Sequence, residues 1–447
     1  MTWIQRYRIK HYLQNSIVIL PVLGVLAGIV VTWLINSVET RMGWRSSLSP
    51  DAARLVIGTL GAAMLTFIIF LSSTLLLAVQ LASAQLTPRA ISFLFRDPIT
   101  KASLTIFVFT FTLSLAVLVR IDETVPLITS KLAAWGCIVS VCTFFYLIDH
   151  IGKALRPSGV LKGIGSTGGK VIETVYPRYL SDAPQAAARP FFDFLDQEPV
   201  LTIANPKPGV VLAFDAHGLV LLARVADCLI ELVPQVGDFI AAGDPLFRVY
   251  QNGKGLAADS LCQCVAVGQE RTHEQDPTLA FRIVVDIAAK ALSPAINDPT
   301  TAVLAIDQIH HLLRRVGRRG LDEGVLRDDS GKVRLVYRTP DWEDFVQLSL
   351  TEVRQFGGSS MQIVRRLRFM LENLLETLPE ARTILLRQEL SLLQRTAERL
   401  FTEPEERALA ATGDSQGMGG TSEWTHKRRN ILSGFAPTSG VDVLREK

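Results

Sequence analysis

Residues 55–81 read LVIGTLGAAMLTFIIFLSSTLLLAVQL, a run of 27 residues without Asp, Glu, Lys or Arg. A helix needs about 17–25 apolar residues to cross a bilayer, so this run predicts a transmembrane helix. Hydroxyl and amide side chains recur along it every seven residues, at Thr59, Thr66, Ser73, Gln80 and Thr87. A straight helix drifts by only about 20° per seven residues, so these five side chains, called here the polar seam, are expected on one face.

Lipid offers a polar side chain no hydrogen-bonding partner, so the polar seam should face protein or water. Two arrangements satisfy this requirement. In a homo-oligomer, the seams of several copies line a water-filled pore, where hydroxyl and amide groups replace the hydration shell of an ion. Within one copy, the same side chains pack against neighbouring helices and hydrogen-bond across the contact. The sequence leaves both open.

Three further apolar runs, at residues 17–35, 104–119 and 132–148, also lack all four charged residue types. The third of the four runs is short, but Lys101 and Arg120 flank it and can reach the membrane interface from its ends. Residues 1–154 therefore predict a membrane α-helical domain with four transmembrane helices. Gly24 and Gly28, four residues apart, predict a close helix–helix contact in the first run.

Basic residues near the helix ends predict the orientation in the membrane. Those on the side of the N-terminus are Arg6, Arg8, Lys10, Arg89, Arg96, Lys101, Lys153, Arg156, Lys162 and Lys170. Those on the other side are fewer: Arg41, Arg45, Arg54, Arg120 and Lys131. We therefore expect a multi-pass protein with both termini in the cytoplasm and the lipid bilayer as its first partner.

The charge and the cysteines exclude other classes. A net charge of +3 over 447 residues argues against a nucleic-acid-binding protein, which would concentrate basic residues. Five cysteines, two of them inside the fourth apolar run, give no disulfide framework. Cys262 and Cys264 have no second pair nearby, so no metal site is expected there.

Residues 155–198 predict a juxtamembrane linker, because they are basic and carry Gly and Pro, with one short helix around residues 169–179. The stretch GSTGGK at residues 165–170 lacks the spacing of a phosphate-binding loop.

Residues 199–258 predict a small β module. Strands are expected at residues 210–214, 219–222, 228–233 and 246–250, which are rich in β-branched and aliphatic residues. The stretch VGDFIAAGDPL at residues 236–246 resembles the turn-and-strand signature of lipoyl- and biotinyl-type domains, which carry their cofactor on a lysine. No lysine lies between Lys207 and Lys254, so a β-barrel-like module without a cofactor is expected.

Residues 259–403 predict an α-rich α+β cytoplasmic domain. Helices are expected at residues 281–292, 299–316, 345–354, 361–376 and 381–401, and a strand at residues 333–338. From residue 404 to residue 447 the chain is polar and Gly-rich, which predicts a disordered tail.

The turn between the first two of these helices is the best binding candidate in the soluble part. Asp298 suits the N-cap of a helix and Pro299 its first position. The candidate binding residues are Ser293, Asn297, Asp298, Thr300 and Thr301, which suit an anion or a partner loop beside free helix N–H groups. A rigid helix–helix corner explains the same residues.

Other polar pairs give weaker hypotheses. Asp149 and His150 end the fourth apolar run, where they suit a proton relay, a cation site or a simple helix anchor. Asp307 and His311 have the i, i+4 spacing that can share a metal, but no third ligand accompanies them. No catalytic signature was found, so no enzymatic activity is expected.

Four motifs together resemble one family. They are QLASAQLTPR at residues 80–89, VGDF at 236–239, GQERT at 268–272 and ALSPAINDPTTA at 291–302. The chain is identified by them as a member of the bacterial predicted-membrane-protein family catalogued as domain of unknown function 2254. The resemblance runs from about residue 10 to residue 400 and implies a bacterial cell-membrane protein, without implying an activity, a ligand or a cofactor.

Three functions remain. The first is a homo-oligomeric channel or transport protein with a cytoplasmic assembly domain, which the polar seam favours. The second is a membrane-anchored sensor or scaffold whose cytoplasmic domain binds a ligand or a protein. The third, a membrane enzyme, has the least support in the sequence.

Overall fold

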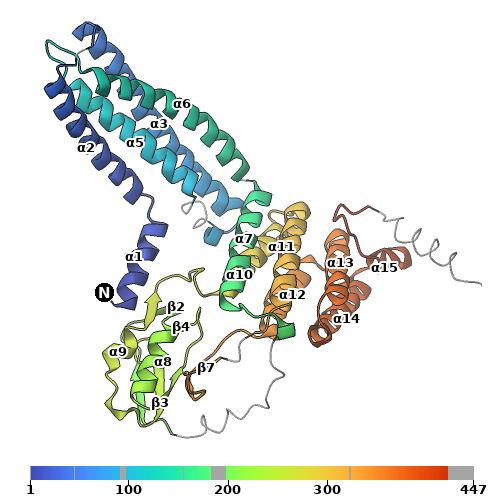
Figure 1. Cartoon of the computed structure of the whole chain (residues 1–447). Coiled ribbons are helices and arrows are strands. Elements are labelled where there is room, and N and C mark those ends of the chain that lie inside the picture. Colours follow the sequence, from blue (N-terminus) through green and yellow to red (C-terminus); the bar gives the residue numbers. More distant parts are fainter. Residues whose placement is uncertain are drawn as a thin grey trace, which may run out of the picture.

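The computed structural model describes residues 2–44, 46–90, 97–154, 156–182, 198–321 and 324–420. A bundle of long helices stands at one end of the molecule, and a β domain and a helical domain lie together at the other (Figure 1). Two residues used to predict the orientation, Arg45 and Arg96, lie outside the described residues, as does the end of the expected tail at 421–447.

The bundle consists of α2 (Ile19–Met42), α3 (Pro50–Gln85), α5 (Pro98–Leu118) and α6 (Leu127–Ala154). These four helices are long and apolar enough to cross a membrane, as the four runs predicted. Helix α5 contacts the other three and is the most buried of them. It begins earlier than expected because Asp97 caps it, accepting a hydrogen bond from the Thr100 backbone N–H at 2.9 Å.

Small and hydroxylated residues line the contacts inside the bundle. A Cβ on Gly24 would lie 3.0 Å from the Thr105 carbonyl oxygen, and one on Gly28 would lie 3.1 Å from Thr112 Cβ. The close helix contact predicted for these glycines is thus confirmed, and α5 is the neighbour.

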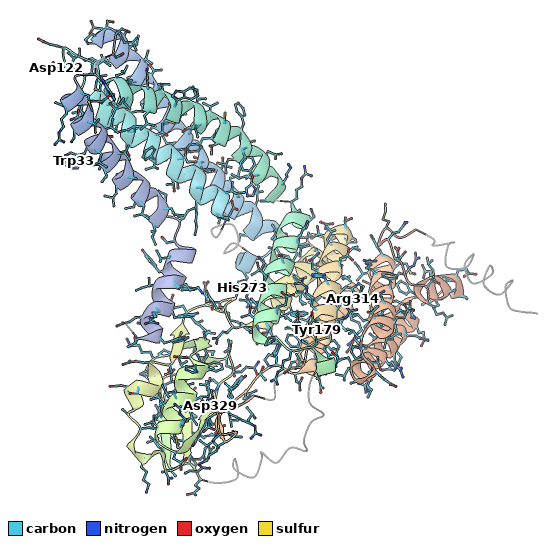
Figure 2. All side chains as sticks on the ribbon, in the orientation of Figure 1. Trp33, Asp122, Tyr179, His273, Arg314 and Asp329 are labelled. Atoms are coloured by element: carbon cyan, nitrogen blue, oxygen red, sulfur yellow. The ribbon has the colours of Figure 1, made fainter. Side chains whose placement is uncertain are left out.

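A buried carboxylate fastens the end of the bundle that is distant from the soluble domains, the end where Figure 2 labels Asp122. Glu39 is 4% exposed, and its Oε2 accepts a hydrogen bond from the Thr129 hydroxyl at 3.0 Å. Its Oε1 accepts the Thr129 backbone N–H at 3.2 Å. Glu39 therefore caps the positive N-terminal end of α6 and ties α2 to it.

Two more helices connect the bundle to the soluble domains: α1 (Trp3–Asn15) precedes α2, and α7 (Pro157–Val175) follows α6. The expectation of a linker over residues 155–198 is wrong for α7. Three glycines of α7, Gly165, Gly168 and Gly169, lie where it packs against the helical domain, and a Cβ on Gly168 would collide with Ala280. Glycine here allows close packing rather than flexibility. Residues 183–197 of the expected linker are outside the described part.

The β domain contains two sheets. Their strands are β1 (Leu201–Ala204), β2 (Gly209–Phe214), β3 (Cys228–Leu232), β4 (Phe239–Ile240), β5 (Pro245–Gln251), β6 (Val265–Gly268), β7 (Val325–Arg327) and β8 (Val333–Tyr337). One sheet has the order β1-β5-β3-β8-β7 and the other β4-β2-β6. All pairs are antiparallel except β3 with β8. The described strands form no closed barrel, so the β-barrel-like module is not confirmed.

Two expectations for this domain need correction. Residues 219–222 lie in helix α8 (Ala216–Val225) rather than in a strand, because Asp215 caps the Gly218 N–H at 3.0 Å and starts a helix. Strands β6, β7 and β8 lie beyond the predicted boundary at residue 258. The chain therefore leaves the β domain, forms two helices and returns.

The helical domain holds the larger core. Its helices are α10 (Pro277–Ala291), α11 (Pro299–Gly317), α12 (Trp342–Gly357), α13 (Met361–Thr377) and α14 (Thr383–Leu400), which match the five predicted ones. The apolar faces of these helices and of α7 share one buried cluster. Short elements elsewhere are α9 (Ala258–Cys262), η1 (Pro88–Ala90), η2 (Leu180–Asp182), η4 (Gly253–Gly255) and η5 (Glu380–Arg382).

The expected disordered tail is wrong for residues 404–420. Helix α15 (Pro404–Ala410) and the strap that follows it, residues 411–420, pack on α13. The fully buried Arg365 donates hydrogen bonds from its guanidinium to the carbonyl oxygens of Thr412, Gly419 and Gly420 at 2.9–3.1 Å. The strap has only two apolar residues, Ala411 and Met418, and Met418 is 79% exposed, so its order comes instead from backbone carbonyls bonded to a buried cation.

Candidate functional site

The polar seam faces away from the bundle. Thr59, Thr66, Ser73 and Gln80 are exposed on α3 in the single chain. The residues of α3 that are buried against the other helices are apolar: Ala53, Ile57, Met64, Leu71 and Ala78. The fifth member, Thr87, is 6% exposed and lies beyond the end of α3. Four of the five seam residues thus share an uncovered face, and the chain does not use them for its own helix packing.

Two hydroxyls of the seam are already hydrogen-bonded within α3. Thr59 donates to the Leu55 carbonyl oxygen at 2.7 Å, and Thr66 donates to the Ala62 carbonyl oxygen at 3.1 Å. Their hydroxyl donors are therefore satisfied whether this face contacts lipid, protein or water. The hydroxyl oxygens are exposed and can still accept hydrogen bonds.

The C-terminal end of α3 contacts the helical domain. Leu86, just past the helix, is 3% exposed and belongs to the buried cluster that α7, α10 and α11 share. Lys290 on α10 donates to the Ser83 carbonyl oxygen at 2.7 Å, and Arg89 Nη1 lies 2.6 Å from Asp286 Oδ2. These contacts attach the end of α3 to the helical domain.

A chain of ion pairs extends this junction across the domain. Arg282 bonds Asp286 on its own helix and both carboxylate oxygens of Glu352 on α12, each at 2.7 Å. Hydrogen bonding to Arg282 lowers the pKa of Glu352 despite its partial burial. The same bonds, with Glu352 first, raise the pKa of Arg282. The Glu352 carboxylate therefore remains charged, and the ion pairs of Arg89 and Arg282 link the end of α3, α10 and α12.

Sequence reasoning missed this junction. It used Arg89 only to predict orientation and Leu86 only as part of a family motif. A usable signal was present, because a leucine and an arginine directly after a span, within a specific motif, suit a contact with another domain. Asp286 and Lys290 gave no signal of their own on an amphipathic helix.

Asp149 and His150 do not act as a pair. His150 Nε2 lies 3.0 Å from Asp97 Oδ2, the residue that caps α5, whereas Asp149 pairs with Lys153 at 2.6 Å. His150 therefore fastens the end of α6 to the start of α5. This geometry fits the simple helix anchor among the three predicted roles.

The candidate turn at residues 293–301 uses most of its polar groups internally. Asp298 accepts from the Thr301 backbone N–H at 3.0 Å and from the Thr301 hydroxyl at 2.5 Å. Ser293 donates to the Lys290 carbonyl oxygen at 2.7 Å, and Asn297 adopts a left-handed φ of 47°. Thr300 is exposed. The rigid corner is therefore the simpler account of these residues.

Asp307 and His311, which have the spacing of a metal-binding pair, lie in different environments. Asp307 accepts a hydrogen bond from Arg366 Nε at 2.8 Å, and burial lowers the pKa of His311. Arg271 is likewise occupied, because its Nε lies 2.6 Å from Asp276, the N-cap of α10. Within the described ranges, no group of three or more His, Cys, Asp and Glu residues could hold a metal ion.

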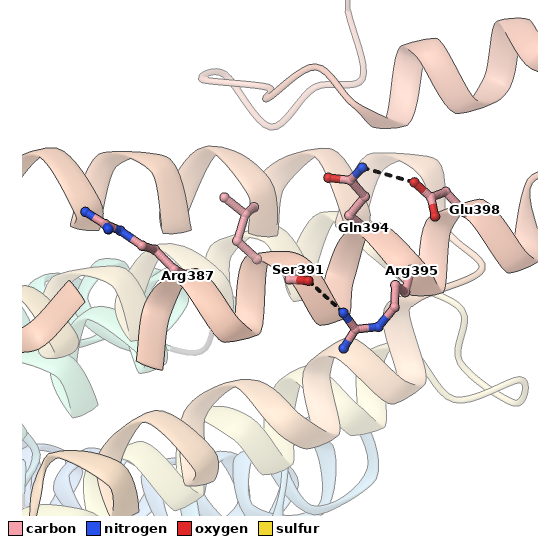
Figure 3. Close-up of a pocket in the computed structure, with 6 residues that line it drawn as sticks. Arg387, Ser391, Gln394, Arg395 and Glu398 are labelled. Carbon is pink, nitrogen blue, oxygen red and sulfur yellow. Dashed lines mark hydrogen bonds between the residues drawn. The ribbon is translucent and has the colours of Figure 1, made fainter. Parts of the chain in front are cut away.

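The soluble part presents a shallow hollow on α14 (Figure 3). It is lined by Arg387, Leu390, Ser391, Gln394, Arg395 and Glu398, all from one helix. Arg395 donates to the Ser391 hydroxyl at 2.7 Å and Gln394 donates to Glu398 at 3.0 Å, so four of its polar side chains are bonded to one another. A site with a single wall cannot enclose a small molecule. The exposed face of α3 and its junction with α10 remain the candidate functional region.

Comparison with known proteins agrees with the membrane architecture. The chain is 26% identical over 428 residues to uncharacterized proteins of Mycobacterium bovis and of two strains of Mycobacterium tuberculosis, covering 91% of this chain and 80% of each relative. No solved structure matches. The profile of the family described as predicted membrane protein DUF2254 matches residues 14–373, most of the chain. By this match, and with its four apolar helices, the chain belongs to that family of membrane proteins.

Proposed function

We propose that the protein is a homo-oligomeric channel of the bacterial cell (inner) membrane in which copies of α3 surround a shared axis. The observation that carries the proposal is the outward position of Thr59, Thr66, Ser73 and Gln80. The chain buries one apolar strip of α3, from Ala53 to Ala78, and leaves the seam bare together with other apolar side chains of the helix. If several copies of α3 surround a water-filled pore, these polar groups contact water. If the seam faces lipid, they find no hydrogen-bonding partner there.

The same face supplies apolar levels between the polar ones. Leu76 and Leu77, which are 62% and 54% exposed, lie between Ser73 and Gln80. A pore lined in this way alternates polar rings with narrow apolar rings, and apolar constrictions close a pore by losing their water. Rotation of α3 by a fraction of a turn changes which ring faces the axis.

The junction at the end of α3 supplies the means to turn it. Leu86, Ser83 and Arg89 attach α3 to α10, so movement of the helical domain is passed to the span that carries the seam. The cytoplasmic domains then act as the assembly and gating collar. Because α1 and these domains lie at one end of the bundle (Figure 1), the proposal places the N-terminus and the helical domain together in the cytoplasm.

The test uses the full chain in liposomes that contain an ion-sensitive dye. The wild type should pass ions, and Ser73→Leu and Gln80→Leu should abolish the flux. Ser72→Leu is the matched control, because Ser72 is also exposed on α3 and bonds the Ile68 carbonyl oxygen at 2.8 Å, but it lies off the seam.

Absence of flux under any voltage, pH or membrane tension would contradict the channel. A membrane-anchored sensor or scaffold, whose cytoplasmic domain binds a ligand or a protein partner, would then be favoured. Thr300→Ala is the variant to test for such binding, since Thr300 is exposed and takes no part in the Asp298 cap.

A further inference from the structure

One face of α1 is bound to the β domain. The Tyr7 hydroxyl lies 3.2 Å from the Thr272 hydroxyl and donates to Glu274 Oε2 at 3.2 Å. One turn further on, His11 Nδ1 lies 3.3 Å from Glu274 Oε1. Trp3 stacks on Tyr7 with ring centroids 5.4 Å apart, and Tyr7 stacks on His11. The i, i+4 spacing places all three rings on the side of α1 that faces the loop after β6, the loop in which Figure 2 labels His273.

The opposite face of α1 is bare and carries three large apolar side chains, with the exposed Gln5 among them. Ile9, Tyr12 and Leu13 are 46%, 67% and 51% exposed, and their spacing of three and four residues gathers them on one side. At 100° per residue, this group points away from the side that carries Trp3, Tyr7 and His11. Side chains of this size on an otherwise attached helix indicate a second contact.

Basic residues flank the bare face. Arg6, Arg8 and Lys10 are all exposed, and residues 3–15 contain neither Asp nor Glu. This combination of an apolar strip with basic edges is the pattern of a helix that lies in the headgroup layer of a membrane with anionic lipids. A second copy of α1 is a poor occupant, because it would bring three like charges against these three.

The position of α1 in the chain leads to the same partner. The first span, α2, begins at Ile19, four residues after α1 ends at Asn15, and a bend separates the two helices (Figure 1). The bare face therefore lies beside the end of a membrane helix. A tyrosine at this level is also typical, because its ring suits the boundary between acyl chains and headgroups.

We propose that α1 is an interfacial helix that binds anionic phospholipid headgroups and clamps the β domain to the membrane surface. Ile9, Tyr12 and Leu13 enter the boundary of the acyl chains, and Arg6, Arg8 and Lys10 contact the headgroups. Tyr7 and His11 hold Glu274 from the other side of the helix. This inference does not depend on conduction by α3.

The test places a photo-reactive benzoylphenylalanine at Leu13 of the full chain, in nanodiscs of equal parts phosphatidylglycerol and phosphatidylcholine. Irradiation should yield lipid adducts that mass spectrometry identifies, with phosphatidylglycerol in about fivefold excess. In a variant with Arg6, Arg8 and Lys10 changed to Gln, adducts should persist and the excess should fall toward equality.

The control places the same probe at Ile384, which is 66% exposed on α14 at the end of the helical domain that is distant from Ser83. This position should give no lipid adduct. Leu13 adducts as rare as those at Ile384, or cross-links from Leu13 to a second copy of the chain, would overturn the proposal. Adducts with equal amounts of both lipids in the wild type would overturn the preference for anionic headgroups.

Discussion

Arg89 Nη1 lies 2.6 Å from Asp286 Oδ2, and this ion pair joins the segment just beyond α3 to the middle of α10. The Arg89 side chain is 56% exposed, so solvent screens the pair and its contribution to stability is at most about 1 kcal/mol. The ion pair instead sets the geometry of the junction, because it fixes which side of α10 contacts the end of α3. The stability of the junction comes mainly from the buried side chain of Leu86.

Leu86→Ala should separate these two effects. Leu86 is 3% exposed in the core of the helical domain, and removing a buried leucine side chain costs about 2–5 kcal/mol. Thermal unfolding of the purified protein in detergent should show a large loss, whereas Arg89→Ala should show a small one. Leu81→Ala is the control, because Leu81 is 42% exposed on α3, five residues before Leu86. Equal effects of Leu86→Ala and Leu81→Ala would mean that α3 is not anchored in this core.

Gly28→Val should disturb the bundle far more than Gly58→Val. A Cβ on Gly28 already lies 3.1 Å from Thr112 Cβ, so further methyl groups push α2 away from α5. Gly58 has nothing within 4 Å of an added Cβ and tolerates the same change. Thermal stability in detergent and the yield of membrane-inserted protein are the measurements. A tolerated Gly28→Val would show that α2 and α5 do not approach so closely.

Asp414→Ala should release the strap on α13. Asp414 is 2% exposed and accepts backbone hydrogen bonds from Gln416, Gly417 and Gly419 at 2.7–3.0 Å. Without it the strap loses its turn, and Arg365 loses the carbonyl oxygens that solvate its buried charge. Limited proteolysis should cut within residues 411–420 of the variant only. A variant as resistant as the wild type would indicate that the strap is held by other contacts.

Acidification should destabilise the helical domain through His310. Burial lowers the pKa of this imidazole below its ordinary value of 6.5, and His310 Nε2 lies 2.9 Å from Asn373 Oδ1. The unfolded chain therefore binds the proton more readily, so the stability from the neutral ring is complete above about pH 6.5 and falls as the pH drops below it. The melting temperature should fall less between pH 7.5 and 5.5 in His310→Gln than in the wild type. Identical pH dependence in both proteins would exclude His310 as a source.

Periodicity and composition were sufficient for the elements that bury a continuous face. The four spans and the five helices from α10 to α14 follow from apolar runs and from caps such as Asp298. The failures occurred where a local signal had a second meaning. Glycines in α7 suggested a linker, but they allow close helix packing. The apolar run at residues 219–222 suggested a strand, but it lies in the helix that Asp215 caps.

The candidate region was predictable only in part. The polar seam was visible because seven-residue spacing is a property of one helix, and its exposure depends on which face α5 covers, which one helix cannot reveal. The junction of Leu86 and Arg89 with α10 joins residues about 200 positions apart. No local pattern encodes such a pair, and the order of the strap likewise depends on an arginine on another helix.

The most direct test asks whether Ser73 faces the water of a conduction path. Ser73→Cys and Ser72→Cys, each with Cys142 changed to Ala, are reconstituted in planar bilayers and exposed to a positively charged thiosulfonate reagent during recording. If the seam lines the pore, Ser73→Cys should lose its current rapidly and irreversibly, and Ser72→Cys should show no change. Unaltered current in Ser73→Cys, equal loss in both variants, or the absence of any current from the parent protein would contradict it.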